Sequence, residues 1–383
     1  MLHVLILGTR GVPARHGGFE TFAEDLSRYL VSRGHGVTVY CQSDSATAIS
    51  EEMWEGIRLI HIPGGKGAKG TLRFDWLSVR HALGEEGVIL TLGYNTAVFS
   101  LMYRFSGRLN LMNMDGVEWK REKWSPAQKA WLWFNELAGA RLSTHLIADH
   151  PEIKRHLMRH TSASKITVIP YGADALNEVA PGAVLAYGLE PGKYFLVIAR
   201  PEPENSLLEI VEAYSAVKRG MPLVVLGNYT PETNTYHRSV VVAAGSEVRF
   251  IGAIYDKEKV QALRFHARAY IHGHRVGGTN PSLVEALAAW NPIIAHDNVF
   301  TRWVAGPRSL YFSNVIDLAA IFDRVLGDEV LLSGMARASR DRHEEVFRQE
   351  HVLSAYESLL METASLPIHN TESISPKTEE EIL

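Results

Sequence analysis

The feature that most constrains the fold is a repeated alternation of short apolar runs with helical segments. Residues 2–7 form the first apolar run, and a glycine-rich loop covers residues 8–18. A segment with apolar residues at helical spacing then leads to a second run at residues 37–41. Short runs that are apolar throughout are typical of parallel strands buried on both faces. This β-loop-α-β order predicts the start of a doubly wound parallel sheet.

The alternation continues in two series along the 383 residues. The first series is completed by apolar runs at residues 57–62, 87–92, 108–114, 143–148 and 165–170. The second has runs at 194–199, 222–227, 248–252, 269–273 and 292–296, with helical segments at 206–220 and 256–267. Asp256 is the expected N-cap of the last of these helices. The length suffices for two α/β domains, each with its own core.

Composition excludes several classes of protein. The net charge of −4 provides no basic field, so we expect no nucleic-acid partner. Cys41 is the only cysteine, which excludes an intrachain disulfide and a multi-cysteine metal site. The chain shows no signal peptide and no run near the roughly 20 apolar residues of a membrane span, so a cytoplasmic location is expected.

The strongest candidate for a binding site lies in residues 272–292. The pattern predicts a strand end, a loop containing Gly278, Thr279 and Asn280, and a helix that begins at Pro281. Backbone N–H groups at a helix N-terminus bind phosphates and other anions. A carboxylate one turn further along, Glu285, can accept hydrogen bonds from ribose hydroxyls. The loop and the acid together indicate a nucleotide-diphosphate pocket, although a solvated helix acid is the alternative for Glu285 alone.

Arg200 follows the run at residues 194–199 directly. An arginine at the carboxyl end of a parallel strand projects into the crevice where such sheets bind ligands, and it pairs bidentately with a diphosphate. A surface salt bridge is the alternative. Asn205 and Ser206 are expected to cap the helix that follows.

The first loop only loosely resembles a dinucleotide fingerprint. Gly8 and Gly11 lack the G-x-G-x-x-G spacing. The place where a dehydrogenase needs an acid for the adenosine ribose holds residues 40–42, Tyr-Cys-Gln, which counts against an NAD oxidoreductase. Gly17 and Gly18 at the start of a helix are expected to bring backbone N–H groups to a phosphate, with a flexible turn as the alternative.

Residues 114–124 form a second cluster of polar and aromatic residues. Asp115 and Glu118 lie just past a strand end, where catalytic carboxylates often sit in open α/β sheets. Basic and aromatic residues follow: Lys120, Arg121 and Lys123 with Trp119 and Trp124, then a helix from Ser125-Pro126 with Trp131, Trp133 and Phe134. Such a mixture suits an anionic membrane surface or a lipid diphosphate. Inward packing is the favoured alternative for Trp131 and Phe134.

Several chemical signatures are missing. No Asp-x-Asp pair is present to hold a nucleotide sugar through a divalent ion, which favours a metal-independent site. The seventeen histidines form no i, i+4 pair with an intervening Glu as in zinc hydrolases, and no G-x-S-x-G elbow occurs. His272 and His274 flank a glycine at a strand end and are expected to be polar caps.

Taken in order, these motifs resemble the retaining GT-B glycosyltransferases of family 4, over nearly all of residues 1–362. The segments that carry the resemblance are Gly17-Gly18-Phe19-Glu20, similar to the Gly-Gly-x-Glu donor loop; residues 169–174, similar to the Ile-Pro-Asn-Gly-Val-Asp hinge; Arg200; and Glu285, similar to the second Glu of the Glu-x7-Glu motif. Three segments, 8–20, 115–124 and 277–287, are similar to a branch that includes bacterial rhamnosyltransferases of surface polysaccharide assembly.

The resemblance implies two Rossmann-like domains with parallel sheets facing a cleft. Its boundaries would be an acceptor-side domain at 1–173, a nucleotide-sugar-binding domain at 174–341, a C-terminal helix at 342–365 that crosses back to the first domain, and a disordered tail at 366–383. The donor would be a nucleotide-diphosphate sugar, with dTDP-rhamnose as the best guess and no cofactor. The acceptor would be a saccharide, linked to a lipid diphosphate at the inner membrane face.

The resemblance also implies roles for individual residues. The donor side comprises Gly17, Gly18, Arg200, Asn205, Gly278, Thr279, Asn280 and Glu285, and the acceptor side comprises Asp115, Glu118, Lys120 and Arg121. Asp115 and Arg200 would act in catalysis. Two positions depart from the family: Gly277 replaces the first Glu of the motif, and Asn205 replaces the expected Lys. A non-catalytic nucleotide-sugar-binding protein and a GT-B sugar-nucleotide epimerase therefore remain alternatives.

Overall fold

A computed structural model describes residues 1–14, 17–44 and 48–366. The chain divides into two compact units. Unit 1 contains Met1–Pro170 and the C-terminal segment from Val352, and unit 2 contains Tyr171–His351. The expected tail lies outside the described residues from position 367 onward.

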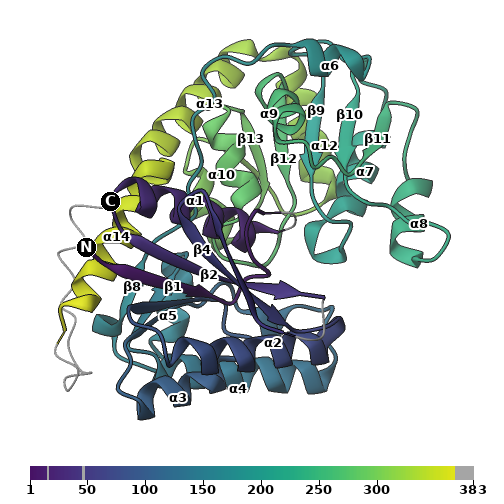
Figure 1. Cartoon of the computed structure of the whole chain (residues 1–383). Helices are drawn as coiled ribbons and strands as arrows, with labels where there is room; N and C mark the ends of the chain where they lie inside the picture. Colours follow the sequence, from purple (N-terminus) through teal and green to yellow (C-terminus); the bar gives the residue numbers. More distant parts are fainter. Residues whose placement is uncertain (15–16, 45–47, 367–383) are drawn as a thin grey trace. The chain divides into compact units, whose positions relative to one another are not determined.

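Unit 1 is built on an eight-stranded sheet with the order β3-β4-β2-β1-β5-β6-β7-β8 (Figure 1). Its strands are β1 His3–Leu7, β2 Gly36–Ser43, β3 Ser50–Trp54, β4 Ile57–Pro63, β5 Val88–Leu92, β6 Asn110–Asn113, β7 His145–Ala148 and β8 Ile166–Val168. All neighbours pair in parallel except β3, which is antiparallel to β4. The seven expected runs of the first series are confirmed as strands. The edge strand β3 was not expected, because it has no continuous apolar run: three of its five residues are polar.

The helices of unit 1 pack on both faces of this sheet (Figure 1). They are α1 Gly18–Ser32, α2 Gly67–Ala82, η1 Ala97–Phe99, α3 Ser100–Phe105, η2 Glu118–Lys120, α4 Pro126–Leu142, α5 Pro151–Leu157 and η3 Ala163–Lys165. The C-terminal helix α14, Gln349–Ala364, joins them: the ring of Tyr356 lies 4.7 Å from that of Phe22, and its hydroxyl accepts a 2.7 Å hydrogen bond from Asn113 at the end of β6.

Unit 2 contains a six-stranded, fully parallel sheet with the order β11-β10-β9-β12-β13-β14. The strands are β9 Phe195–Ile198, β10 Leu223–Leu226, β11 Val248–Gly252, β12 Ala269–His272, β13 Ile293–His296 and β14 Leu310–Phe312. The helical segments are α6 Gly182–Ala186, η4 Pro203–Asn205, α7 Leu207–Ser215, α8 Thr235–Val242, α9 Lys257–Phe265, α10 Pro281–Ala288, α11 Val299–Ala305, α12 Val315–Gly327, α13 Glu329–Arg342 and η5 His343–Phe347. The five expected runs of the second series are confirmed. Two separate clusters of buried apolar side chains pack the two faces of the sheet.

Helix capping bears out one expectation and corrects another. Asp256 caps α9, because its carboxylate accepts a hydrogen bond from the backbone N–H of Lys259 at 3.2 Å. The expected capping of α7 was wrong. Ser206 occupies the N-cap position with φ +53° and makes no capping bond, while its hydroxyl accepts from the Arg275 guanidinium at 2.8 Å. The Asn205 amide donates instead to the carbonyl of Arg200 at 2.8 Å.

Candidate functional site

The strand order of unit 2 defines the crevice in which its candidate site lies. From β9 the chain proceeds outward through β10 to β11, then returns to place β12 on the other side of β9. In open α/β sheets, ligands bind outside the carboxyl ends of the strands at such a reversal. The two loops at this point, residues 199–206 and 273–280, contain most of the expected donor-side residues.

Arg200 follows the end of β9 and has an exposed side chain. Among the described residues, no hydrogen bond or ion pair involves its guanidinium; only its backbone carbonyl is used, by Glu202 and Asn205. The alternative of a surface salt bridge therefore finds no partner in the described parts of the chain. The guanidinium of Arg200 is permanently charged, and its N–H donors have no acceptor among the described residues at the carboxyl edge of the sheet.

Direct contacts hold the two loops of this crevice together. A Cβ atom on Gly273 would meet the Asn205 carbonyl oxygen at 2.2 Å, so the close approach of the loops requires glycine there. The backbone N–H of Arg275 donates to the Glu204 carbonyl at 2.9 Å. The Arg275 guanidinium also reaches the carboxylate of Glu209 on α7. Asn205 itself is 3% exposed, so it supports the loop that carries Arg200.

The loop before α10 combines an unusual backbone with a capped helix start. Gly277 has φ +130°, a conformation that L-residues rarely adopt. Asn280 caps α10 by accepting a 3.0 Å hydrogen bond from the N–H of Ser282, and Pro281 occupies the first turn. Gly278 and Asn280 line a small cavity of about 10 Å³, and Thr279 is 2% exposed.

Glu285 lies on α10 and is paired with a buried arginine. Its Oε2 atom is 2.5 Å from Nη2 of Arg264 on α9; the Arg264 side chain is 6% exposed, whereas that of Glu285 is 45% exposed. Arg264 also donates to the hydroxyl of Ser282 at 3.0 Å. Tyr270 on β12 links Ser282, at 2.7 Å, to the carbonyl of Ile198 at the end of β9, at 3.2 Å. This network ties Glu285 to the strand that Arg200 follows, and Arg264 gave no signal in the sequence.

Of the two histidines at and after the end of β12, His272 differs from the expected polar cap. Both ring nitrogens of His272 are buried without a hydrogen-bond partner in the described residues, so the capping expectation was wrong for this residue. Its ring stacks on that of His274, with 4.3 Å between centroids and 9° between planes. Burial, followed by the nearby His274 and His296, lowers the pKa of His272 well below its ordinary value. His272 is therefore neutral at physiological pH.

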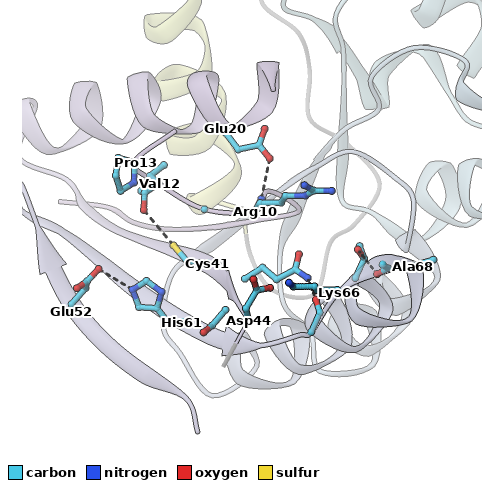
Figure 2. Close-up of a pocket in the computed structure, with 16 residues that line it drawn as sticks. Arg10, Val12, Pro13, Glu20, Cys41, Asp44, Glu52, His61, Lys66 and Ala68 are labelled. Atoms are coloured by element: carbon cyan, nitrogen blue, oxygen red, sulfur yellow. Dashed lines mark hydrogen bonds and ion pairs between the residues drawn. The ribbon is translucent and has the colours of Figure 1, made fainter. Parts of the chain in front are cut away.

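Unit 1 has a cavity of about 780 Å³ at the carboxyl ends of β1, β2 and β4 (Figure 2). It is lined by the loop after β1 (Arg10–Pro13), Glu20 on α1, the end of β2 and the residue after it (Cys41–Asp44), Glu52, His61 and the segment after β4 (Gly65–Ala68 and Thr71). The backbone N–H of Arg10 donates to Glu20 at 3.4 Å, and His61 pairs with Glu52 at 2.9 Å. This volume is typical of a small-molecule site. No sequence motif predicted it, because its walls come from four separate segments.

Chain packing requires Gly8 and Gly11 in the first loop, while phosphate binding by Gly17 and Gly18 stays a prediction. A Cβ on Gly8 would meet the Leu92 carbonyl oxygen at 2.2 Å, and one on Gly11 would meet the sulfur of Cys41 at 2.6 Å. Gly17, with φ +90°, occupies the N-cap position of α1, and Gly18 begins that helix. Because β2 extends to Ser43, the residue after the strand is Asp44, so the expected lack of an acid at this place was wrong. The loop spacing remains as an argument against a dinucleotide pocket.

Asp115 lies two residues beyond β6 with φ +50°, and the Asn113 side chain accepts a 2.9 Å hydrogen bond from its backbone N–H. Burial and, secondarily, the nearby Glu118 raise the pKa of Asp115 to about 6. A carboxyl group with such a pKa exchanges protons near neutral pH. Asp75 on α2, which the sequence did not single out, has a pKa raised by burial to about 6 despite a 2.9 Å hydrogen bond from Thr96.

Of the other expected acceptor-side residues, Glu118 and Arg121 pair with each other, whereas Lys120 does not join them. Glu118 lies 2.6 Å from the guanidinium of Arg121 and 3.9 Å from the ammonium group of Lys123. Lys120 is exposed, with its ammonium 5.5 Å from the centre of the Trp119 ring. None of these residues lines the described walls of the unit 1 cavity.

The aromatic side chains of α4 are exposed, so the expectation of inward packing was wrong. Trp131, Trp133 and Phe134 are 42%, 46% and 47% exposed. They belong to a larger surface on α2, α3 and α4, which we call the aromatic face; it also includes Leu72, Trp76, Leu101 and Phe105. Among the described residues, no helix combines the length and apolar character needed to span a membrane.

Comparison with known proteins identifies the fold. A family profile described as a domain of unknown function, DUF1972, matches residues 1–174, close to the extent of the first segment of unit 1. No curated protein matches significantly. Among solved structures, sucrose-phosphate synthase from Thermosynechococcus elongatus has a TM-score of 0.81 at 16% identity, covering 95% of this chain and 100% of its own.

Two further structures show the same likeness. The Anabaena protein HepE, in complex with UDP and glucose, has a TM-score of 0.75 at 15% identity, over 96% of this chain and 100% of its own. The alpha,alpha-trehalose 6-phosphate synthase of Burkholderia multivorans has a TM-score of 0.71 at 13% identity, over 95% and 99%. At these identities the likeness concerns the fold. The chain therefore has the α/β GT-B fold, with two Rossmann-like units built on parallel sheets.

Proposed function

We propose that this protein is a glycosyltransferase that moves a sugar from a nucleotide-diphosphate donor to a saccharide acceptor. The observation that carries the proposal is Arg200: an exposed guanidinium, without a partner in the described chain, at the strand reversal of unit 2. The proposal is also supported by the fold, which the chain shares with sucrose-phosphate and trehalose 6-phosphate synthases. The same fold occurs in HepE, which was solved with UDP and glucose.

In this proposal unit 2 binds the donor. Glu285 accepts hydrogen bonds from the ribose hydroxyls, and Arg264 orients its carboxylate. Arg200, together with the backbone N–H groups of Gly278, Thr279 and Asn280, stabilises the charge that develops on the departing diphosphate. Stabilisation of a leaving group by oriented donors is usually among the strongest contributions to catalysis.

Unit 1 binds the acceptor. Its cavity offers hydroxyl, amide, carboxylate and cationic side chains, a mixture that suits the many hydroxyl groups of a saccharide. Asp115, with a pKa of about 6, is the acceptor-side carboxylate. As the resemblance to family 4 implies, transfer proceeds with retention and without a metal ion in the donor site. It needs no enzymic nucleophile, because the departing phosphate takes the acceptor's proton. The donor we favour is dTDP-rhamnose.

The proposal is tested by a thermal-shift screen of nucleotide sugars followed by a turnover assay with the donors that bind. A ligand at a hundredfold its Kd adds roughly 2.7 kcal/mol to stability, which is an easily measured shift. Arg200→Ala is expected to abolish the shift and to lower turnover by about 10²- to 10³-fold. Arg308→Ala is the matched control. Arg308 is also exposed, but it precedes the amino end of β14, whereas Arg200 follows the carboxyl end of β9.

The outcomes separate the proposal from its alternatives. If no sugar nucleotide stabilises the wild-type chain, the proposal fails. Binding without transfer to any saccharide indicates a non-catalytic sugar-nucleotide-binding protein, and conversion of the donor without an acceptor indicates an epimerase. A response to NAD alone would indicate an oxidoreductase that uses the unit 1 cavity, where Asp44 follows β2.

We further propose that the aromatic face binds an anionic membrane and brings the enzyme to a lipid-diphosphate-linked acceptor. Helices α2, α3 and α4 contain six basic residues, Lys69, Arg73, Arg80, Arg104, Lys129 and Arg141. Their only acids are Asp75 and Glu136, and neither is exposed. Aromatic residues interspersed with basic ones suit the interface of an anionic bilayer. Each basic side chain near such a surface contributes about 1 kcal/mol.

Vesicle co-sedimentation tests this surface. The chain is expected to bind vesicles that contain phosphatidylglycerol and to bind neutral phosphatidylcholine vesicles far less. Phe105→Ser removes an 83%-exposed ring and should weaken binding by about 10- to 150-fold, from the roughly 1.5–3 kcal/mol that a buried Phe side chain contributes. Ile316→Ser on α12 is the control, since Ile316 is 81% exposed but lies in unit 2. Equal loss in both variants, or no vesicle binding at all, would remove the membrane proposal.

A further inference from the structure

Three potential metal-ligating side chains converge on one face of unit 1. Glu136 lies in the middle of α4, His156 lies in α5, and His160 follows α5 by three residues. One ligand atom from each lies within 4.8 Å of the other two. The turn that follows α5 places His160 beside His156, with 5.8 Å between the centroids of the two rings.

Both imidazoles direct Nε2 at the same carboxylate oxygen. Oε1 of Glu136 is 2.7 Å from Nε2 of His156 and 3.4 Å from Nε2 of His160. Ligands in a tetrahedral zinc site with bonds near 2.0–2.1 Å are separated by about 3.3 Å. The separations of 2.7 Å and 3.4 Å lie on either side of this value, and the ligand atoms of the two histidines lie within 4.8 Å of each other. Two imidazoles and one carboxylate form a common zinc ligand set, which leaves a fourth position for water.

The surroundings of Glu136 support a bound cation. Its side chain is 2% exposed, and an ionised carboxylate at such a place requires a compensating charge. Among the described residues, no lysine or arginine forms an ion pair with it. The other carboxylate oxygen, Oε2, accepts a 2.9 Å hydrogen bond from the indole N–H of Trp119. Carboxylate ligands of metals are commonly oriented by such a second hydrogen bond.

From this geometry we infer that Glu136, His156 and His160 bind one zinc-like divalent cation. The site joins α4 to the end of α5 and to η2, where Trp119 lies, so the ion ties together three segments beyond β6 and β7. It is independent of the proposed transferase function, because none of its residues belongs to the donor-side set or to the described lining of the unit 1 cavity. The metal-independent expectation concerns the donor site and is not altered.

The test is a Zn²⁺ titration of the full chain without a histidine tag, after treatment with a chelator, against a chromophoric competitor. The wild-type chain is expected to bind one Zn²⁺ per chain. His156→Gln and His160→Gln should each abolish stoichiometric binding, and Trp119→Phe should weaken it by about 10- to 100-fold. His61→Gln is the matched control: His61 also pairs with a carboxylate, Glu52 at 2.9 Å, but no second imidazole joins them in the described part of the chain.

Two outcomes would overturn the inference. One is the lack of stoichiometric Zn²⁺ binding by the wild-type chain, which would make the cluster a hydrogen-bonded group of side chains. The other is binding that survives both histidine substitutions, or that His61→Gln removes equally. If the histidine variants do not fold, Co²⁺ bound to the wild-type chain decides: one equivalent must give the visible bands of tetrahedral nitrogen and oxygen ligation. The donor-induced thermal shift of the metal-free chain tests the transferase proposal separately.

Discussion

The charged groups near the carboxyl edges of the two sheets differ in their surroundings. In unit 2 two pairs of charged groups compensate each other, Glu285 with Arg264 and Arg275 with Glu209, while Arg200 has no partner among the described residues. In unit 1 the carboxyl groups of Asp115 and Asp75 are perturbed mainly by burial, and both pKa values are raised to about 6.

This difference separates two kinds of site. Counter-charges hold groups ionised at all physiological pH values, which suits a ligand of constant charge such as a diphosphate. Desolvation poises a carboxyl group between its two protonation states, so its capacity to accept a hydrogen bond from an acceptor hydroxyl group changes with pH. Unit 2 is therefore expected to be insensitive to pH near neutrality, whereas unit 1 is expected to change with it.

The largest predicted effect concerns the counter-charge in unit 2. Glu285→Ala leaves the 6%-exposed guanidinium of Arg264 without its carboxylate, so we expect the free energy of unfolding to fall by about 2 kcal/mol. That figure is below the roughly 3–5 kcal/mol of a fully buried pair, because Glu285 is itself 45% exposed. Glu285→Gln keeps an acceptor oxygen and should cost about 1 kcal/mol. Urea unfolding measures both values.

A double-mutant cycle with Arg264→Met isolates the pair. Removing both charges should return the unfolding free energy to within about 1 kcal/mol of the wild-type value. Glu329→Ala is the control, since Glu329 pairs with Arg268 but is 73% exposed, and Arg268 keeps its bonds to the carbonyls of Val325 and Leu326. If Glu285→Ala lowers the free energy of unfolding no more than Glu329→Ala does, the ion pair between Glu285 and Arg264 does not stabilise the unit 2 site.

The strands could be predicted because burial on both faces leaves continuous apolar runs in the sequence. The two missed strands lack that signal: β3 has no continuous apolar run, and β14 has only three residues. The aromatic residues of α4 gave a misleading signal, since spacing alone does not distinguish an inward face from an outward one.

The candidate sites also differed in whether the sequence alone could predict them. Residues 277–285 form one contiguous loop and helix start, so the sequence located them. The unit 1 cavity, Arg264 and the Glu136–His156–His160 cluster are assembled from segments far apart in the chain, and no spacing rule connects them.

The second prediction concerns pH and Asp115. The folded protein binds this proton more tightly than the unfolded chain, whose ordinary pKa is 3.8. The destabilising effect of ionisation is therefore absent below about pH 4, grows as the pH rises, and is complete above about pH 6. Asp115→Asn should raise the unfolding free energy by about 1–2 kcal/mol at about pH 7.5 and leave it unchanged at about pH 4. Asparagine also tolerates the φ of +50°.

Function distinguishes Asp115 from the second carboxyl group. In the proposed role Asp115 must be ionised, so wild-type kcat/KM should fall below about pH 6, and Asp115→Asn should lose most turnover. Asp75→Asn is the control: it should give the same pH-dependent gain in stability with turnover unchanged. If kcat/KM does not fall below about pH 6 and Asp115→Asn keeps full activity, the proposed role of Asp115 is contradicted.

The last prediction tests the backbone at Gly277, where the sequence differs from the Glu-x7-Glu motif that it otherwise resembles. With φ +130°, Gly277 adopts a conformation that strains any L-residue, although a Cβ atom at this position would have no neighbour within 4 Å. Gly277→Ala should therefore lower the unfolding free energy by about 1–2 kcal/mol through strain alone. Gly334→Ala, in the interior of α13 and equally free of neighbours, should raise it by about 0.5–1 kcal/mol. For the same reason Gly277→Glu should not increase the donor-induced thermal shift. A stable Gly277→Glu variant with tighter donor binding would mean that this loop readily takes the family's conformation, and that unit 2 does not depend on its glycine.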